Sequence, residues 1–227
     1  MYPNSNLIPL VIHQFVSDRD KIPPLQEGCM RQWEDFAEKH EFEYYLWTLL
    51  SIKKLIEREG RQDWAELIAN CRNYGEYGDI VRFIVLSVFG GWWVDWDIGI
   101  IHPEKLAVFL NRFHCKATVT EENYLCIEFF GAPKNSDITL NFLESLYRRN
   151  KNRGDTVGYS GPGGFSNFIK QDTKYAGLIN TFPVTDLFQA GYMQVKAGYR
   201  PSADAPQPLF HYWGHVWFTE KINPQHL

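Results

Sequence analysis

The segment 79–97 limits the fold of this chain more than any other stretch of its sequence. In its first half, apolar residues recur at spacings of three and four, which predicts a helix over 79–89. Gly90-Gly91 follows, and glycine accepts the left-handed backbone conformation that ends many helices. Residues 92–94 then read as a short buried strand that leads directly into Asp95 and Asp97. A helix, a sharp turn and a buried strand in immediate succession are typical of a layered α/β domain.

The same alternation runs through most of the 227 residues. The pattern predicts strands at 7–16, 42–47, 92–94 and 126–130, and helices at 25–40, 50–59, 63–70, 79–89 and 138–150. The glycine-rich stretch 154–164 is expected to be a loop, and the apolar stretch 98–102 continues from the two aspartates toward Pro103. We therefore expect one α/β domain over 1–227, with helices flanking a largely parallel sheet.

Asp95 and Asp97 are the strongest candidates for metal ligands. Residues two apart on a strand point to the same side, so the two carboxylates would crowd together at the strand end. Such like charges repel unless a cation lies between them, and hard divalent cations such as Mn²⁺ or Mg²⁺ prefer oxygen ligands. A solvated turn with two ordinary acidic residues is the alternative. The buried strand before the pair favours the metal, since ligands in α/β sheets bind at the carboxyl ends of strands.

Asp79 and Arg82 form a second candidate pair. Their spacing of three places them on one face at the start of the predicted helix. Arginine supplies a fixed fork of donors and aspartate supplies acceptors, which suits a ligand rich in hydroxyl groups or phosphate. A local ion pair or a helix cap is the alternative for this pair.

Composition narrows the classes of partner. The net charge is −4 and the sequence has no basic block, so nucleic acid is not expected as a partner. The eight Trp, twelve Tyr and sixteen Phe fit either a core rich in rings or a protein that stacks rings on sugars. No apolar run is long enough to span a membrane, which leaves peripheral membrane association open.

The cysteines and the first residues bear on the expected location. The four cysteines, Cys29, Cys71, Cys115 and Cys126, include no C-x-x-C pair and are expected to be free thiols. Residues 1–6 are short and polar, unlike a secretory signal. A cytoplasmic, reducing location is therefore expected.

Six segments of the sequence carry a resemblance to a known family: 8–14 (IPLVIHQ), 44–47 (YYLW), 78–82 (GDIVR), 89–97 (FGGWWVDWD), 159–164 (YSGPGG) and 211–217 (HYWGHVW). Taken together, they resemble glycosyltransferase family 32, a group that is distantly similar to the glucosylating clostridial toxins. The block 78–97 is the most specific of them, because it matches a D-x-x-R helix followed by G-G-x-[YW]-x-D-x-D. The others are individually weak but follow the family's order.

The resemblance implies a GT-A fold, a Rossmann-like mixed sheet flanked by helices. It also implies a metal-dependent, retaining glycosyltransferase that moves a sugar from a UDP- or GDP-sugar donor. The implied acceptor is a glycan, which includes lipid-linked, lipopolysaccharide and capsule-type glycans. By correspondence, Asp97 would bind Mn²⁺ or Mg²⁺ directly and Asp95 would contact the ribose or the metal's water shell. Asp79 and Arg82 would position the donor sugar, and no catalytic nucleophile is identified.

The resemblance also assigns residues outside the central block to the donor site. His13, Gln14 and Phe15 lie where the family places the nucleotide, although a strand-end hydrogen bond is an equal alternative for His13 and Gln14. Gly163, in the glycine-rich stretch, and Trp217 are further expected contacts to the donor.

His211 is the candidate third metal ligand or diphosphate contact, with His215 in reserve. A place in an ordinary aromatic cluster is the alternative for His211.

Two departures from the family pattern leave other functions open. The tryptophan that the family often carries two residues after the H-Q pair is Val16 here, so base stacking falls to Phe15 or another ring. The serine before the last tryptophan is Val216. A nucleotide-sugar or carbohydrate-binding protein without transfer activity is one alternative. A metal-dependent phosphoryl-transfer enzyme or hydrolase is the other.

Overall fold

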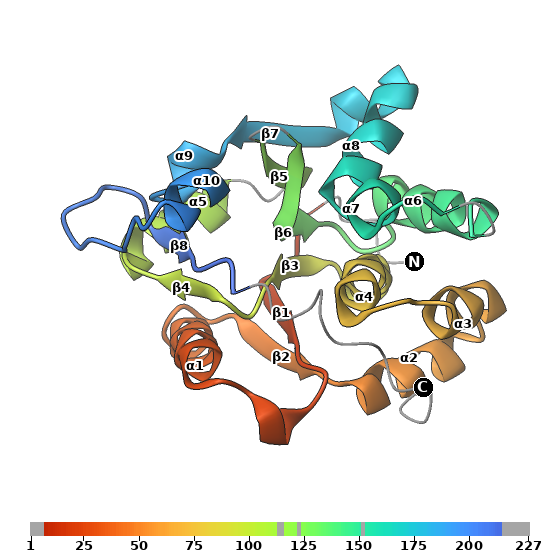
Figure 1. Cartoon of the computed structure of the whole chain (residues 1–227), viewed down its shortest axis with the longest axis horizontal. Coiled ribbons are helices and arrows are strands. Elements are labelled where there is room, and N and C mark those ends of the chain that lie inside the picture. Colours follow the sequence, from red (N-terminus) through yellow and green to blue (C-terminus); the bar gives the residue numbers. More distant parts are fainter. Residues whose placement is uncertain (1–6, 113–115, 122–123, 151–152, 215–227) are drawn as a thin grey trace.

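The computed structural model describes residues 7–112, 116–121, 124–150 and 153–214, and its centre is a six-stranded sheet with the order β2-β1-β3-β6-β5-β7 (Figure 1). The strands of this sheet are β1 (Val11–Phe15), β2 (Glu43–Trp47), β3 (Gly91–Val94), β5 (Ala117–Glu121), β6 (Leu125–Ala132) and β7 (Ile179–Pro183). Strands β4 (Ile98–Ile100) and β8 (Leu209–His211) form a separate antiparallel pair. The helices are α1 (Pro24–Lys39), α2 (Leu49–Glu59), α3 (Gln62–Ala69), α4 (Tyr74–Phe89), α5 (Pro103–Arg112), α6 (Asp137–Arg148), α7 (Thr156–Tyr159), α8 (Pro162–Gln171), α9 (Val184–Leu187) and α10 (Tyr192–Lys196), with 3-10 turns at Arg19–Lys21 and Thr173–Leu178.

The central sheet is mixed. Strand β1 pairs in parallel with β2 and β3, and β5 pairs in parallel with β7. Strand β6 runs antiparallel to both β3 and β5. The expected α/β fold with a mixed sheet flanked by helices is thus confirmed, and three of the five pairings among the described strands of this sheet are parallel.

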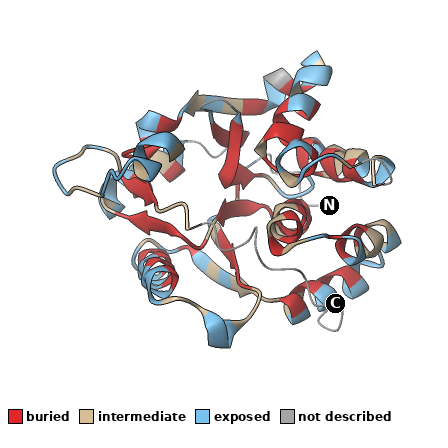
Figure 2. Ribbon diagram, viewed as in Figure 1, coloured by how far each residue is buried: buried red, intermediate tan, exposed pale blue. Residues whose placement is uncertain are grey.

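Two apolar cores lie on opposite faces of the sheet, and strand β3 contributes to both. Trp93 packs into the core formed with α2, α3, α4, α6 and α8, while Trp92 packs into the core formed with α1, α5 and α9. Both rings are buried, and the four inner strands β1, β3, β5 and β6 are buried along nearly their whole length, whereas the edge strands β2 and β7 are largely exposed or half-buried (Figure 2). Because successive strand residues point to opposite faces, two adjacent tryptophans fix β3 between two layers of helices. Truncating either one should cost about 3–5 kcal/mol of stability.

Helix α4 determines how the chain enters β3. It begins at Tyr74, earlier than the predicted start at Asp79, because the Asn73 side chain caps it by accepting from the Glu76 backbone N–H at 2.9 Å. Two glycines with positive φ angles, 68° at Gly90 and 100° at Gly91, end it. A Cβ on Gly90 would lie 2.5 Å from the Lys134 nitrogen, so both conformation and space require glycine there.

The prediction of a loop over 154–164 is wrong, since this stretch contains α7 and the start of α8. Asp155 caps α7 by accepting from the Gly158 N–H at 2.6 Å, and Pro162 occupies the first turn of α8. Glycines at 163 and 164 allow α8 to pack closely on the backbone of α7. Close packing and caps therefore offset the low helix propensity of glycine.

Among the described residues, no helix has the length and apolar character needed to cross a bilayer. The thiols of Cys29 and Cys71 are buried, and Cys115 lies outside the described residues.

Candidate functional site

A pocket of about 510 Å³ opens where β3 ends, between α4, β6, α7 and β8. Its polar lining residues are Asp79, Arg82, Asp95, Asp97, Glu128 and His211. Its aromatic lining residues are Phe15, Tyr74, Trp93, Trp96, Tyr124, Tyr192 and Trp213. The structure therefore brings four predicted site residues from α4 and the end of β3 together with His211, which is more than a hundred residues later in the chain.

Asp95 follows directly after β3 and is held by two side chains. Its Oδ1 accepts from Nη2 of Arg82 at 2.7 Å and from Nε1 of Trp93 at 2.8 Å. Its backbone N–H donates to the Glu128 carbonyl at 2.9 Å, which extends the β3–β6 pairing by one residue. Burial raises the pKa of Asp95, and the charge of Arg82 opposes that rise.

Asp97 is paired with His211 by the β4–β8 ladder. Ile98 and His211 are register partners, and the Tyr212 N–H donates to the Asp97 carbonyl at 3.0 Å. Nε2 of His211 lies 3.1 Å from Oδ1 of Asp97, and the Gly214 N–H donates to Oδ2 at 2.7 Å. Resemblance predicted a role for His211 beside the aspartates, and the structure places it there.

The pKa values of Asp97 and His211 shift in opposite directions. Burial alone would raise the pKa of Asp97, but the charge and hydrogen bond of His211 and the Gly214 N–H outweigh it, and the net pKa is lowered. Burial would lower the pKa of His211, but the charge of Asp97 and its hydrogen bond outweigh it, so the net pKa is raised. Both shifts favour the ionised forms of the pair, an imidazolium beside a carboxylate.

The two aspartates share the pocket for a different reason from the one the sequence suggested. They lie in a turn beyond β3, in which the Ile98 N–H donates to the Asp95 carbonyl at 3.2 Å, and not on a continuing strand. Each carboxylate is held by a different basic side chain, Asp95 by Arg82 and Asp97 by His211. Their mutual repulsion is therefore offset by protein groups on both sides.

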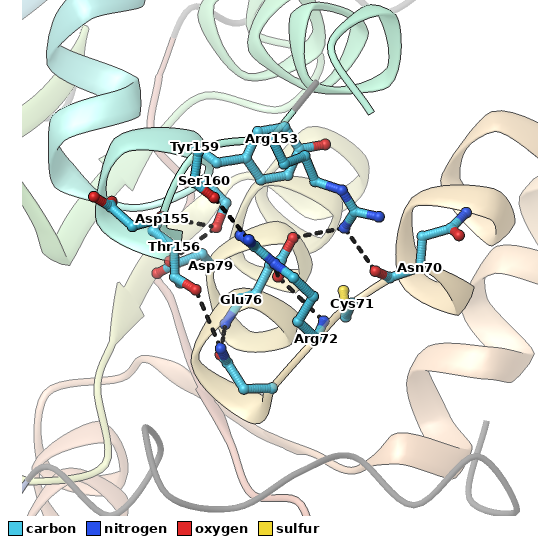
Figure 3. Close-up of polar contacts among 12 residues, drawn as sticks. Asn70, Cys71, Arg72, Glu76, Asp79, Arg153, Asp155, Thr156, Tyr159 and Ser160 are labelled. Atoms are coloured by element: carbon cyan, nitrogen blue, oxygen red, sulfur yellow. Dashed lines mark hydrogen bonds and ion pairs between the residues drawn. The ribbon is translucent and has the colours of Figure 1, made fainter. Parts of the chain in front are cut away.

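Asp79 links the pocket to α7. Its Oδ1 lies 3.4 Å from Nη1 of Arg82, and its Oδ2 accepts from the Ser160 hydroxyl at 3.1 Å (Figure 3). Burial raises the pKa of Asp79 to about 7, although Arg82 lowers it. The local ion pair that was the alternative is present, and because both residues also line the pocket, their role in binding a ligand stays a prediction. Ser160 was not anticipated as a partner of Asp79.

A second charged group lies one turn earlier on α4. Glu76 is fully buried and accepts from Nε of Arg72 and from Nη1 of Arg153, each at 2.8 Å (Figure 3). The Arg72 backbone N–H also donates to Glu76 at 3.1 Å. We call these three residues the Glu76 cluster. It ties the start of α4 to the segment before α7 and so fixes the helix that carries Asp79 and Arg82.

Glu128 is a site residue that the sequence reasoning missed. It lies on β6, lines the pocket and is only 5% exposed. Its Oε1 has no hydrogen-bond partner among the described residues, and burial raises its pKa. Nδ1 of His211 and Nε of Arg82 are likewise buried without a partner in the described structure. Such buried polar atoms are costly unless a ligand or water satisfies them.

His13 and Gln14 lie beneath the site and do not line it. His13 is buried among Tyr45, Trp47 and Phe89, donates from Nε2 to the Gly90 carbonyl at 2.8 Å and accepts from Nε1 of Trp47 at 3.1 Å. Burial lowers its pKa to about 4, against the effect of the Gly90 bond, so the ring is neutral.

Gln14 accepts from the Tyr44 hydroxyl at 2.8 Å, and its amide lies 3.4 Å from the Asp95 carbonyl. The strand-end hydrogen bond is thus the alternative that the geometry favours for both His13 and Gln14. Phe15 does line the pocket, with its ring 5.3 Å from that of Tyr77.

The predicted site residues that remain are Gly163, Trp217 and His215. Gly163 lies in α8 against the backbone of Val157, and it is the neighbouring Pro162 that lines the pocket. Trp217 and His215 lie outside the described residues. Val16, at the position where the resemblance leads one to expect a tryptophan, is buried against Trp96, which itself lines the pocket.

The donor set fits a divalent metal that shares its coordination with a substrate. Among the described residues, no three His, Cys, Asp or Glu side chains converge on one point to hold an ion. Mg²⁺ and similar ions, however, are commonly bound by one or two carboxylates together with phosphate oxygens of a substrate. Asp95 and Asp97, two hard ligands at the rim of one pocket, fit that arrangement.

The solved structures that are similar to this chain include two glycosyltransferases. The PaToxG glycosyltransferase matches with a TM-score of 0.54 and 16% identity, over 75% of this chain and 74% of that chain. A glycosyltransferase involved in the glycosylation of the major capsid of PBCV-1 matches with a TM-score of 0.51 and 11% identity, over 90% of this chain and 92% of that chain. This chain therefore has the fold of these glycosyltransferases.

Comparison of sequences gives no match to a protein-family model and none to a curated protein. The resemblance to glycosyltransferase family 32 stays a prediction.

Proposed function

We propose that this protein is a retaining glycosyltransferase that uses a UDP- or GDP-sugar and a divalent metal to glycosylate a glycan acceptor. The observation that carries this proposal is the pocket at the end of β3, where Arg82 joins Asp79 to Asp95 beside the Asp97–His211 pair. The glycosyltransferase fold adds support, since ligands in α/β sheets bind at this edge.

The diphosphate and the sugar of the donor would contact different parts of the pocket. Asp97 and Asp95, with His211 behind them, would hold Mn²⁺ or Mg²⁺ and through it the diphosphate. The metal would supply charge neutralisation for the departing diphosphate. Rings at the pocket wall, among them Phe15 and Trp96, would contact the base.

The donor sugar would contact the polar wall formed by α4 and β6. Asp79 offers acceptors, Arg82 offers a guanidinium N–H, and Glu128 offers a buried carboxylate oxygen. A sugar ring carries several hydroxyl groups, each of which both donates and accepts. Hydroxyl groups at this wall would satisfy the buried atoms of Glu128 and Arg82 that the described protein leaves without partners.

The transfer step requires stabilisation of the leaving group more than a strong base. The bond between the anomeric carbon and the diphosphate oxygen breaks, and the diphosphate leaves with the electron pair. The acceptor oxygen bonds to the same face of the oxocarbenium-like carbon, and its proton passes to the departing phosphate oxygen. Preorganised charges in a closed pocket are effective at stabilising such a transition state.

A panel of nucleotide sugars tests the proposal directly. Thermal unfolding is measured with each UDP- and GDP-sugar, with and without Mn²⁺, since a ligand that binds the folded state raises the melting temperature. We expect one donor to stabilise the protein only when the metal is present. Release of nucleoside diphosphate is then followed with that donor and a set of oligosaccharide acceptors.

The outcomes separate the competing functions. Metal-dependent stabilisation with release of nucleoside diphosphate supports a transferase. Stabilisation without release, over many acceptors, indicates a binding protein. Release of inorganic phosphate indicates a hydrolase or phosphoryl-transfer enzyme and overturns the proposal.

A further inference from the structure

A second pocket, also about 510 Å³, adjoins the first on the side of α10 and β8. Tyr192 and Trp213 line both pockets, and their rings pack edge to face with centroids 5.4 Å apart. Two side chains thus form the boundary between the pockets. A molecule in the second pocket would reach the first across these rings.

Aromatic rings form most of the walls of the second pocket. Tyr199 stacks on Phe210 at 6.2 Å, and Phe210 packs edge to face with Tyr212 at 4.9 Å. Tyr199 is exposed, while Tyr212 and Trp213 are partly exposed. Rings with one open face and a polar tip suit ligands that present both apolar C–H faces and hydroxyl groups, which is the surface of a sugar.

The charged residues of this pocket are both cations. Lys196 and Arg200 are exposed lining residues, and no Asp or Glu lines the pocket with them. The Lys196 ammonium lies 5.7 Å from the Tyr192 ring centroid, and Nη1 of Arg200 donates to the Tyr199 carbonyl at 3.0 Å. Neither cation is ion-paired with a carboxylate in the described part of the chain. On a chain of net charge −4, this local positive charge selects for a negative ligand.

We propose that the second pocket is the acceptor site and that the acceptor is an acidic glycan, one that carries a carboxylate or phosphate group beside the sugar to be modified. This inference rests on the proposed transferase function, because it assigns the acceptor of that reaction. The rings bind sugar faces, Lys196 and Arg200 bind the acid group, and the reacting hydroxyl reaches across the rings of Tyr192 and Trp213 toward the anomeric carbon.

A glycan array with uronate-bearing, phosphate-bearing and neutral oligosaccharides tests the inference. The variant Lys196→Ser/Arg200→Ser is compared with Lys54→Ser/Lys170→Ser, which removes the same charge from exposed positions on α2 and α8. The unmodified protein should prefer acidic glycans. The first variant should bind them about tenfold more weakly, because charge-assisted contacts are lost. The second variant should bind them normally.

Two readouts keep this inference separate from the proposed function. Thermal stabilisation by nucleotide sugar and Mn²⁺ reports on the first pocket and should be equal in both variants. If stabilisation is absent while acidic glycans still bind through Lys196 and Arg200, the transferase proposal fails and the glycan site stands. Equal or stronger binding of neutral glycans, or acidic binding that survives the substitutions, overturns the acceptor site. Binding to phosphatidylglycerol vesicles but to no acidic glycan also overturns it, in favour of a membrane surface.

Discussion

Helix α4 carries two buried groups of charged residues that differ in how completely they are paired. In the Glu76 cluster, both carboxylate oxygens accept from arginine, so the charge is satisfied within the protein. Six residues later, Arg82 belongs to the charged wall of the pocket, where Glu128 Oε1 and His211 Nδ1 have no partner among the described residues. We call Arg82, Asp95, Asp97, Glu128 and His211 the pocket cluster.

The difference separates residues that hold the fold from residues that bind. A buried charge without a partner costs free energy, so a sequence that keeps one at a pocket wall is suited to a ligand that completes the pairing. A buried charge with every atom paired contributes rigidity and needs nothing further. Substitutions in the Glu76 cluster should therefore change stability, and those in the pocket cluster should change activity.

The largest effect is expected for Asp97→Ala. Loss of the carboxylate that faces His211 should lower release of nucleoside diphosphate about a thousandfold, because stabilisation of the leaving group is lost. The exposed Asp35→Ala on α1 is the control and should be fully active. Full activity of Asp97→Ala with added Mn²⁺ would remove Asp97 from the site.

Glu76→Ala tests the prediction that the Glu76 cluster stabilises the fold. Removing the buried carboxylate leaves Arg72 and Arg153 without their partner, which should cost about 3–5 kcal/mol of unfolding free energy. Urea unfolding measures this cost. Glu144→Ala, which breaks an exposed pair with Arg148, should cost roughly 0–1 kcal/mol and is the matched control. Equal losses in the two variants would show that the pairing of Glu76 does not stabilise the fold.

Glu128→Gln should have opposite effects on activity and stability. The amide keeps the shape but removes a buried charge whose Oε1 lacks a partner in the described structure, so stability at pH 8 should be unchanged or higher by about 1 kcal/mol. Transfer should fall about tenfold, since a strong acceptor for a sugar hydroxyl is lost. Glu121→Gln, at an exposed position on β5, is the control. Unchanged kinetics together with a lower melting temperature would place Glu128 with the structural charges.

Asp79 lies on α4 between Glu76 and Arg82, and its raised pKa predicts that the stability of the fold depends on pH. Its pKa rises from an ordinary 3.8 to about 7 on folding, so between those values the folded state binds more protons than the unfolded state. Stability from this group is present at low pH and is lost as pH rises through 7, with a slope of at most about 1.4 kcal/mol per pH unit.

Urea unfolding from pH 4 to pH 8 measures this slope in the unmodified protein and in Asp79→Asn. His13, whose pKa falls from 6.5 to about 4, contributes the opposite slope in both proteins, so the difference between them isolates Asp79. Identical profiles for the two proteins would contradict the raised pKa.

The centre of the site was predictable from sequence because local patterns determine it. Apolar periodicity indicated α4, the double glycine indicated its end, and the apolar run before Asp95 indicated β3. Strand periodicity could not show that Asp95 and Asp97 lie in a turn held by Arg82 and His211. That arrangement depends on β8, which pairs with β4 from more than a hundred residues away.

Glu128 and α7 were missed for two different reasons. Glu128 is the only charged residue in the apolar segment β6, and a lone charge inside a buried strand is a usable signal of a site. Helix α7 lies in a stretch predicted as a loop because the glycines at 154, 158 and 161 lower helix propensity. The packing and the Asp155 cap that overcome this penalty are tertiary features. Ser160, at the end of α7, was missed with the helix that positions it.

Because of the turn at Gly90 and Gly91, the number of residues between Arg82 and Asp95 cannot change without moving Asp95 away from Arg82. One inserted residue there would exchange the faces of Trp92 and Trp93 and turn Asp95 away from Arg82. Evolution can therefore substitute side chains in this stretch more freely than it can change its length. Among descendants of a common ancestor that keep the activity, insertions and deletions should be absent between these two residues, even where the rest of the sequence has diverged.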